Sequence, residues 1–418
     1  MTSDASLRPG NEAIYAWVWL PGATRPVVAG RLFEADESPR RYFFVYGRSY
    51  LANDRAIALS AADLPLREGV HEPTGMNVLP PCLRDAGPDA WGRRILESRF
   101  PAHHLNELDY LLLAGSDRIG ALDFQASSRV FAEKGTKAAT LDELARSADI
   151  IDRREPLHPE LEAALLRGTS VGGARPKALL GQGERAFIAK FSSTSDTYDV
   201  IKAEYLGMKL AARCGLDVAR VDITQALGKD VLLVERFDRE TRDGRHSRLM
   251  MESALSLLVL DEMEARHASY LDLADLVRHR FAHPRETLRE LFSRLAFNVL
   301  IGNTDDHARN HAAFWDGSTL RLTPAYDLCP QPRTGGEATQ AMKIEGAQGN
   351  KATLVNVLSV SDRFFLSADE ATRIINQMID TIRAEWPRVC EQAGMAEAEA
   401  SRLRNGAVLS DFCLQGWP

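Results

Sequence analysis

The stretch 301–315, IGNTDDHARNHAAFW, concentrates side chains that can bind a metal ion or move a proton. It holds two adjacent acids, Asp305 and Asp306, together with two histidines and two asparagines, directly after an apolar run. A further acid, Asp327, follows in LTPAYDLCP. Transfer of a phosphoryl group needs a carboxylate that orients or deprotonates the acceptor hydroxyl, and oxygen ligands for Mg²⁺. The stretch supplies side chains of both kinds.

The spacing of these residues fits that chemistry for one of the two adjacent acids. Protein kinases place an Asp, four residues and an Asn in the catalytic loop, with a metal-binding Asp further along. Asp305 and Asn310 have this spacing and Asp306 does not, while Asp327 follows a strand-like LRLTP. Two alternatives remain open. One is a polar loop with capping Asp and Asn side chains. The other is a two-histidine metal site at His307 and His311, although no Glu lies between them as in HExxH.

The upstream half of the chain offers a phosphate cradle and a lysine. Gly172 and Gly173, in TSVGGARPKALL, precede a strand and would let backbone N–H groups approach phosphate oxygens, although a plain turn is also possible. FIAKF places Lys190 within an apolar strand, where unpaired burial would be costly. Either Lys190 points outward from an edge strand, or it grips phosphate with Glu204 of the next helix as its acidic partner. In a two-lobed kinase, VERFDR would then be the hinge.

The elements that must position these residues change in character along the chain. Strands are indicated by runs of aromatic and β-branched residues. Helices are indicated by helical spacing of apolar residues and, after Ser367, by a capping box that Ser367 forms with Glu370. The predicted strands are 13–20, 41–47, 177–181, 185–191 and 230–237, and the predicted helices are 90–100, 199–215, 250–260, 285–302 and the run after Ser367. A strand-rich unit, a small β-plus-helix unit and a helical unit therefore follow one another, which is one way to build a nucleotide cleft.

The composition is that of a globular protein and excludes several classes. The 418 residues are 45% hydrophobic and 26% charged, and no apolar run reaches the roughly 18–20 residues of a membrane span. A net charge of −7 argues against broad nucleic-acid affinity. The N-terminus lacks the pattern of a signal peptide, and the five separated cysteines argue against zinc or dithiol chemistry. We expect a cytoplasmic protein with free thiols that does not associate with membranes.

Taken together, these stretches resemble the HipA family of bacterial serine/threonine kinases, the toxins of HipA–HipB toxin–antitoxin modules. The matching stretches are SVGGARPK, AKF, VERFDR, LIGNTDDHARNHAAF, PAYDL and AMKIEG, preceded by PDAWGRRIL and GALDF. The resemblance implies an α+β, two-lobed protein-kinase-like fold. Its parts would be a β-rich N-terminal subdomain (1–130), an ATP-binding N-lobe with the glycine loop and hinge (131–237), and a helical C-lobe with the catalytic and metal-binding loops (238–418).

The resemblance also implies a role for each candidate residue. Asp305 would be the catalytic base, and Asn310 and Asp327 would hold Mg²⁺. Ser170 would be the autophosphorylation site, although Thr169 beside it leaves the modified hydroxyl open. The residues expected to contact ATP are Ser170, Val171, Gly172, Gly173, Lys177, Lys190, Glu235, Phe237, His307 and Asn310.

The implied function is that of an ATP- and Mg²⁺-dependent serine/threonine protein kinase that inhibits growth and produces drug tolerance. Its expected protein substrate is an aminoacyl-tRNA synthetase, and its expected partner is a HipB-like helix-turn-helix antitoxin that links it to operator DNA. The chain lacks His-Arg-Asp, Asp-Phe-Gly and Ala-Pro-Glu, so it is not of the eukaryotic type. A catalytically weak scaffold that acts as a co-repressor with the antitoxin, and a kinase of small molecules, remain the alternatives.

Overall fold

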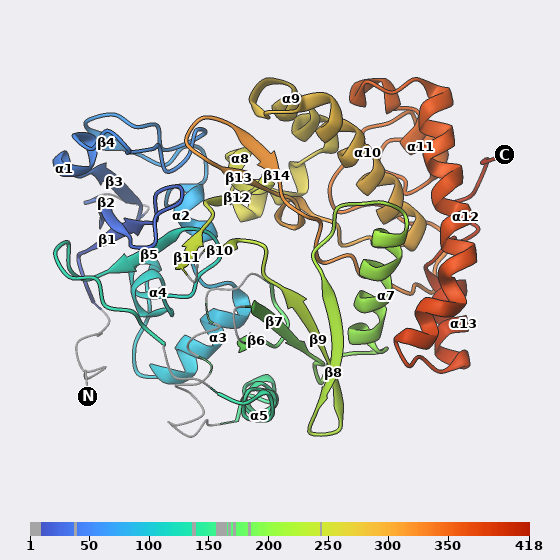
Figure 1. The fold of residues 1–418 in the computed structure, drawn as a ribbon, viewed down its shortest axis with the longest axis horizontal. Helices are drawn as coiled ribbons and strands as arrows, with labels where there is room; N and C mark the ends of the chain where they lie inside the picture. The colour runs from blue at the N-terminus through green and yellow to red at the C-terminus, as the bar shows by residue number, and fades with distance from the viewer. Residues whose placement is uncertain are drawn as a thin grey trace. The chain divides into compact units, whose positions relative to one another are not determined.

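The computed structural model describes residues 10–36, 40–135, 139–155, 165, 169, 173–182, 185–242 and 245–418. Two compact units make up the chain (Figure 1). The first unit comprises Met1–Asp196, Thr224–Glu252 and Phe314–Ser318, and the second comprises Thr197–Ile223, Ser253–Ala313 and Thr319–Pro418. Each unit is described separately below.

An antiparallel sheet opens the first unit. Its order is β4-β3-β2-β1-β5. Alternation of side chains explains why one face is buried: in β3, Tyr42, Phe44 and Tyr46 are buried while the residues between them are only partly covered. The strands are β1 (Ala13–Val18), β2 (Val27–Glu34), β3 (Tyr42–Tyr46), β4 (Val70–His71) and β5 (Leu122–Gln125).

A second sheet in the chain has the order β6-β7-β9-β8. Its strands are β6 (Lys177–Gln182), β7 (Arg185–Phe191), β8 (Val221–Ala226) and β9 (Lys229–Glu235). Phe187, Ala189 and Phe191 of β7 lie in one hydrophobic cluster with Trp91. The alternating pattern of β7 therefore turns every second side chain towards this core and leaves Lys190 on the other face.

Short helices and a hairpin complete the first unit. Asp89 caps α3 by accepting from the Gly92 N–H, and capping boxes begin α4 and α5. These elements are α1 (Arg48–Leu51), α2 (Pro81–Asp85), α3 (Ala90–Arg99), α4 (Glu107–Leu113), α5 (Leu141–Asp152) and the hairpin β10 (Arg239–Arg242) and β11 (Arg245–Arg248).

Helices dominate the second unit, in which α12 packs along α7 and α10 (Figure 1). A three-stranded sheet has the order β12-β13-β14. The elements from α7 onward, apart from those already given, are α7 (Val200–Arg213), β12 (Met251–Ser253), α8 (Ala254–Leu257), η2 (Glu262–His267), α9 (Tyr270–Arg280), α10 (Pro284–Ile301), η3 (Ala308–Asn310), β13 (Ala312–Trp315), β14 (Leu320–Leu322), α11 (Leu354–Leu358), η4 (Ser361–Phe364), α12 (Ala368–Gln392) and α13 (Glu397–Gly406).

Most predicted elements are confirmed, and one is wrong. The strands at 13–20, 41–47, 177–181, 185–191 and 230–237 and the helices at 90–100, 199–215 and 285–302 correspond to observed elements, as does the capping box of α12. The segment 250–260 was predicted as a long helix. It instead forms β12 and the short α8, because Met251–Ser253 joins the β12-β13-β14 sheet and Val259 adopts a left-handed φ of 56°.

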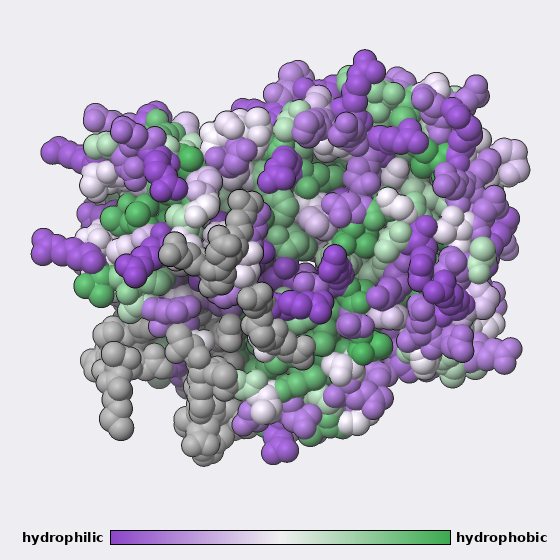
Figure 2. Space-filling model, viewed as in Figure 1, coloured by the Kyte–Doolittle hydropathy of each residue, from purple (hydrophilic) through white to green (hydrophobic). Residues whose placement is uncertain are grey.

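The hydropathy of the surface is that expected of a chain with 26% charged residues. Hydrophilic side chains cover most of the face drawn in Figure 2. Among the helices that the structure describes, none combines the length and apolar character needed to cross a membrane.

Candidate functional site

In the second unit, the acidic stretch begins where α10 ends. Gly302 follows α10 with a left-handed φ of 66°, and a Cβ on this residue would lie 2.7 Å from the Ala407 carbonyl oxygen. The position therefore requires glycine on two counts. Beyond it, the side chain of Asp305 is exposed, whereas that of its neighbour Asp306 is 1% exposed. The adjacent carboxylates thus have opposite environments.

Hydrogen bonds gather the predicted catalytic and metal-binding residues of the second unit. The Asn310 Nδ2 donates to the Asp305 carbonyl oxygen at 3.3 Å, which ties together the two ends of the Asp-x₄-Asn spacing. The Tyr326 hydroxyl donates to the Arg309 carbonyl oxygen at 2.7 Å and so joins this loop to the segment that carries Asp327. Asp305 and Asn310, which the sequence analysis pairs by their spacing, are therefore neighbours in the fold.

The electrostatics of this cluster favour a divalent cation. Desolvation raises the pKa of Asp305, and the carboxylates of Asp327 and Asp306 raise it further, while His307 and Gln331 act in the opposite direction. Neighbouring carboxylates disfavour each other's ionised form, and a bound cation relieves that repulsion.

The available ligands suit Mg²⁺. Because the Asn310 amide nitrogen is engaged, its amide oxygen is the atom left for a ligand. Within the described residues, no three His, Cys, Asp or Glu side chains form a metal site by themselves. Mg²⁺ needs only one or two protein ligands when phosphate oxygens and water supply the others.

The backbone at Asp327 is held in an uncommon conformation. Its φ of 62° is left-handed, which costs a non-glycine residue on the order of 1 kcal/mol or more. The Asn303 Nδ2 donates to the Asp327 carbonyl oxygen at 3.5 Å. Residues kept in such conformations are enriched at ligand-binding sites.

The two-histidine metal site is not formed. His307 and His311 do not share a helical face, because the chain between them includes only the three-residue η3. The Nε2 of His311 instead pairs with Asp306 Oδ1 at 2.9 Å, and His311 is buried in the second unit. The Nδ1 of His307 is buried and has no hydrogen-bond partner among the described residues.

In the first unit, Lys190 lies on an interior strand. It is half-buried in β7, which is flanked by β6 and β9, and its cross-strand partners are Lys177 and Leu232. The expectation of an edge strand is therefore wrong, because β9, which is distant in the sequence, covers that edge. The alternation that places Lys190 on the face away from the aromatic core is confirmed.

The glycine segment is described from Gly173 onward, and Ser170, Val171 and Gly172 lie outside the described residues. Gly173 has a φ of 114°, and a Cβ there would lie 2.6 Å from the Lys177 Nζ. That ammonium group forms an ion pair with Asp89 Oδ2 at 2.7 Å, and both side chains are at least 95% buried. Lys177 is thus fixed beside the glycine segment.

The helix α3 holds this segment at several points. The Trp91 Nε1 donates to the Lys177 carbonyl oxygen at 2.9 Å, and the Arg94 guanidinium donates to the Ala174 carbonyl oxygen. A Cβ at Gly92 would lie 1.9 Å from the Thr169 carbonyl oxygen, so only glycine permits this approach. The contact between α3 and the glycine segment was not predicted.

The neighbouring hydroxyl is inaccessible. Thr169 is fully buried, and its Oγ1 accepts a hydrogen bond from the Gly115 N–H at 3.0 Å. A protein kinase acts on an exposed hydroxyl that can reach the γ-phosphate. Thr169 does not meet that requirement in this conformation.

Successive residues of the predicted hinge alternate between partly exposed and buried positions. Glu235 pairs with Arg185 at 2.6 Å, and the ring of Phe237 lies 6.0 Å from that of Phe314. The residues between and after them, Arg236 and Asp238, are buried in an ion-pair network.

This network anchors the hinge to the N-terminal part of the first unit. Arg236 contacts Asp117 at 2.9 Å and Asp238 at 2.7 Å, and Asp238 accepts from the Gly120 N–H at 2.8 Å. Burial opposes the charge on Asp238, but Arg236 and Arg239 lower its pKa to about 2. These contacts therefore fix the backbone of the predicted hinge.

Comparison with known proteins identifies the family. The family model of the HipA-like C-terminal domain matches residues 169–386, and that of the HipA N-terminal domain matches residues 18–125. The chain belongs to the HipA family.

Relatives and a solved HipA structure agree with this assignment. "Putative kinase Y4mE" of Sinorhizobium fredii is 27% identical and is matched over 87% of this chain and 90% of its own length. "Serine/threonine-protein kinase toxin HipA" of Shewanella oneidensis is 28% identical over 38% of this chain and 42% of its own. The Shewanella oneidensis HipA solved with HipB and operator DNA superimposes with a TM-score of 0.68, at 19% identity, over 93% of this chain and 94% of that one. The α+β HipA fold is confirmed.

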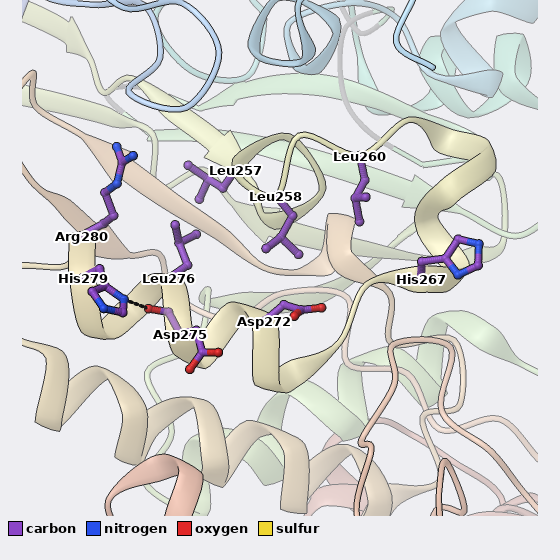
Figure 3. A pocket seen from close by; sticks show the side chains of 9 residues that line it. All are labelled: Leu257, Leu258, Leu260, His267, Asp272, Asp275, Leu276, His279 and Arg280. Carbon is purple, nitrogen blue, oxygen red and sulfur yellow. Dashed lines mark hydrogen bonds between the residues drawn. The ribbon is translucent and has the colours of Figure 1, made fainter. Parts of the chain in front are cut away.

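The second unit also has a pocket whose lining includes none of the predicted site residues. It has a volume of about 640 Å³, and Figure 3 shows leucines from α8 and the following turn opposite carboxylates of α9. Asp275 pairs with Arg278 and Arg363, and Asp272 accepts from the Ser269 hydroxyl. Its lining is Leu257, Leu258, Leu260, His267, Asp272, Asp275, Leu276, His279 and Arg280, none of which is an ATP-site candidate.

Proposed function

We propose that this HipA-family protein is an ATP- and Mg²⁺-dependent serine/threonine protein kinase that acts as a growth-inhibiting toxin. The observation that carries the proposal is the cluster of Asp305, Asn310 and Asp327 in the second unit, in which desolvation and then the neighbouring acids raise the pKa of the Asp305 carboxyl. The relative of Shewanella oneidensis whose name gives it this activity supports the same assignment.

Each residue of the cluster has a distinct role in this proposal. Asp305 orients the acceptor hydroxyl and takes its proton, and a raised pKa makes its carboxylate a stronger base. The Asp327 carboxylate and the Asn310 amide oxygen hold Mg²⁺, which neutralises charge on the phosphates. His307, whose ring influences the Asp305 carboxyl, contacts the bound nucleotide.

The first unit contributes the nucleotide-binding groups. Backbone N–H groups of the glycine segment, from Ser170 to Gly173, and the ammonium group of Lys190 contact the phosphates, while Lys177, buried against Asp89, holds the segment in place. The backbone at Glu235 and Phe237 binds the adenine edge. Nucleotide binding would thus belong to 131–237 and catalysis to 238–418, with 1–130 as a separate subdomain.

Regulation and partners form the second part of the proposal. Autophosphorylation of Ser170 would place a dianion in the phosphate-binding segment, where it repels ATP. The burial of Thr169 supports Ser170 as the modified residue. A HipB-like helix-turn-helix antitoxin would neutralise the toxin and link it to operator DNA, as HipB accompanies the Shewanella oneidensis HipA. An aminoacyl-tRNA synthetase would be the protein substrate.

Phosphate transfer from labelled ATP tests this proposal. The protein is first treated with phosphatase, and its intact mass verifies that it carries no phosphate. Wild type, Asp305→Asn and the control Asp411→Asn, which changes an exposed Asp elsewhere in the second unit, are then compared with Mg²⁺ and with EDTA. We expect Mg²⁺-dependent label on Ser170 and on a synthetase in wild type and control, and at least a hundredfold less in Asp305→Asn. Wild type that binds ATP but transfers no label would refute the proposal.

A further inference from the structure

Behind the exposed Asp305 lies a continuous set of buried polar side chains from three parts of the second unit. They come from the start of α9, the end of α10 and the loop after it. None is more than 2% exposed. We call them the loop-anchoring network, and its members are Tyr270, Asn298, Asn303, Asp306 and His311.

Hydrogen bonds run without a break through this network. The Tyr270 hydroxyl donates to Asp306 Oδ2, and His311 Nε2 pairs with Asp306 Oδ1 at 2.9 Å. Asn298 Nδ2 donates to the Tyr270 oxygen at 3.4 Å, and Asn303 Nδ2 donates to Asn298 Oδ1 at 2.9 Å. Both oxygens of the Asp306 carboxylate are therefore engaged.

The network ends at the residues that the proposed reaction uses. Asp306 is joined by one peptide bond to Asp305, and Asn303 also donates to the carbonyl oxygen of Asp327, the residue with the left-handed φ. The main chain is pinned as well, since the Met342 N–H donates to the Asp306 carbonyl oxygen at 2.9 Å. One buried structure thus connects the backbone beside the base with the backbone of a metal ligand.

We propose that the loop-anchoring network, with Tyr270 and Asp306 as its positioning residues, sets the placement of Asp305 and Asp327 for catalysis. The inference rests on the proposed kinase function. Asp306 is not a second base, because it is 1% exposed and both of its oxygens are hydrogen-bonded inside the unit. Supporting groups of this kind change activity by roughly 10–100-fold when they are removed, although they never touch the substrate.

The AMKIEG stretch acquires a role in this arrangement. The Tyr270 N–H donates to the Lys343 carbonyl oxygen at 2.9 Å, and the Lys343 N–H donates to that of Ala268 at 2.9 Å. Because Met342 also bonds to Asp306, the same strand-like segment holds both partners of the Tyr270–Asp306 contact. Its two large apolar side chains, Met342 and Ile344, are fully buried and fix the segment in the core.

Tyr270→Phe is the decisive variant, because it removes only the hydroxyl of a fully buried ring. Tyr110→Phe is the matched control, since Tyr110 also donates to a carboxylate, that of Glu97 at 2.7 Å, but lies in the first unit. Steady-state kinetics of phosphate transfer would be measured for both variants. We expect kcat of Tyr270→Phe to fall roughly 10–100-fold with KM for ATP changed less than about threefold, and Tyr110→Phe to match wild type. An unchanged kcat in a folded Tyr270→Phe would overturn the inference.

Hydrogen exchange provides a test that needs neither turnover nor a variant. In the wild-type protein, we expect amides of 303–311 to be protected to a similar degree as those of α10, although most of this stretch is a loop. Tyr270→Phe should increase exchange there and around Asp327, with α12 unaffected. Exchange of 303–311 in wild type as fast as in an exposed loop would overturn the inference even if Tyr270→Phe failed to fold. Absence of phosphate transfer in wild type would instead refute the kinase function and leave the exchange result to decide the network.

Discussion

Asp89→Asn should destabilise the protein through one buried charge while leaving the adjacent helix cap in place. Asp89 Oδ2 accepts from the Lys177 Nζ at 2.7 Å, and the two side chains are 5% and 2% exposed. Its Oδ1 caps α3 by accepting from the Gly92 N–H at 2.8 Å. Asn keeps the cap through its own Oδ1, but its NH₂ group then faces the ammonium group of Lys177.

The size of the effect follows from this geometry. Breaking a buried ion pair by removing one partner costs about 3–5 kcal/mol, because the remaining charge stays desolvated. Lys177 is held in place, since its side chain is 2% exposed and the Trp91 Nε1 of α3 donates to its carbonyl oxygen. We therefore expect a loss of about 3–5 kcal/mol in the free energy of unfolding for Asp89→Asn.

Urea unfolding at pH 7 measures this loss, and a double variant tests its cause. Asp89→Asn combined with Lys177→Met removes both charges and should be more stable than Asp89→Asn alone by at least about 2 kcal/mol. Because a chain of two units can unfold in steps, hydrogen exchange of β6 is followed in parallel. A loss below about 1 kcal/mol, or a double variant no more stable than the single one, would refute the reasoning.

Two further predictions concern acid sensitivity. The Asp238 pKa of about 2 lies below its ordinary 3.8, so its contribution of about 2 kcal/mol is present above pH 4 and lost as the pH falls through 2. Asp238→Asn should abolish that part of the acid destabilisation, and equal acid sensitivity in urea titrations would contradict this. Burial raises the Asp63 pKa to about 6, so stability falls as the pH rises from about 4 to 6. Asp63→Asn should therefore gain up to about 3 kcal/mol at pH 7 and nothing at pH 3, and a loss at pH 7 would contradict it.

Elements with strong local signals could be predicted from the sequence. The capping box at Ser367 begins α12, and the apolar spacing of 285–302 matches α10 because helical periodicity and caps are properties of the segment itself. The segment 250–260 has the apolar content of a helix, but its first part pairs with β13, whose sequence lies about sixty residues away. Backbone pairing with a distant strand is a tertiary effect that local propensity does not contain.

In the candidate site, too, one part could be predicted from the sequence and another part could not. Spacing selected Asp305 over Asp306, and the exposure of Asp305 agrees with that choice. The role of the second acid could not be predicted, because its partner Tyr270 lies 36 residues earlier and bears no motif of its own. Asp305 and Asp306 differ in solvent exposure because of the residues packed around them. Tyr270 of α9 contacts Asp306, and the sequence of the loop alone does not contain that contact.

The contact between α3 and the glycine segment changes how the N-terminal part of the chain is understood. The predicted domains assign α3 to a separate N-terminal subdomain, yet Asp89 and Trp91 both contact Lys177, 88 and 86 residues further along. Without α3, Lys177 would lose its buried ion pair with Asp89, and its carbonyl oxygen would lose the Trp91 donor. The N-terminal part is thus a structural component of the proposed phosphate-binding segment, because residues of α3 hold both the side chain and the carbonyl oxygen of Lys177.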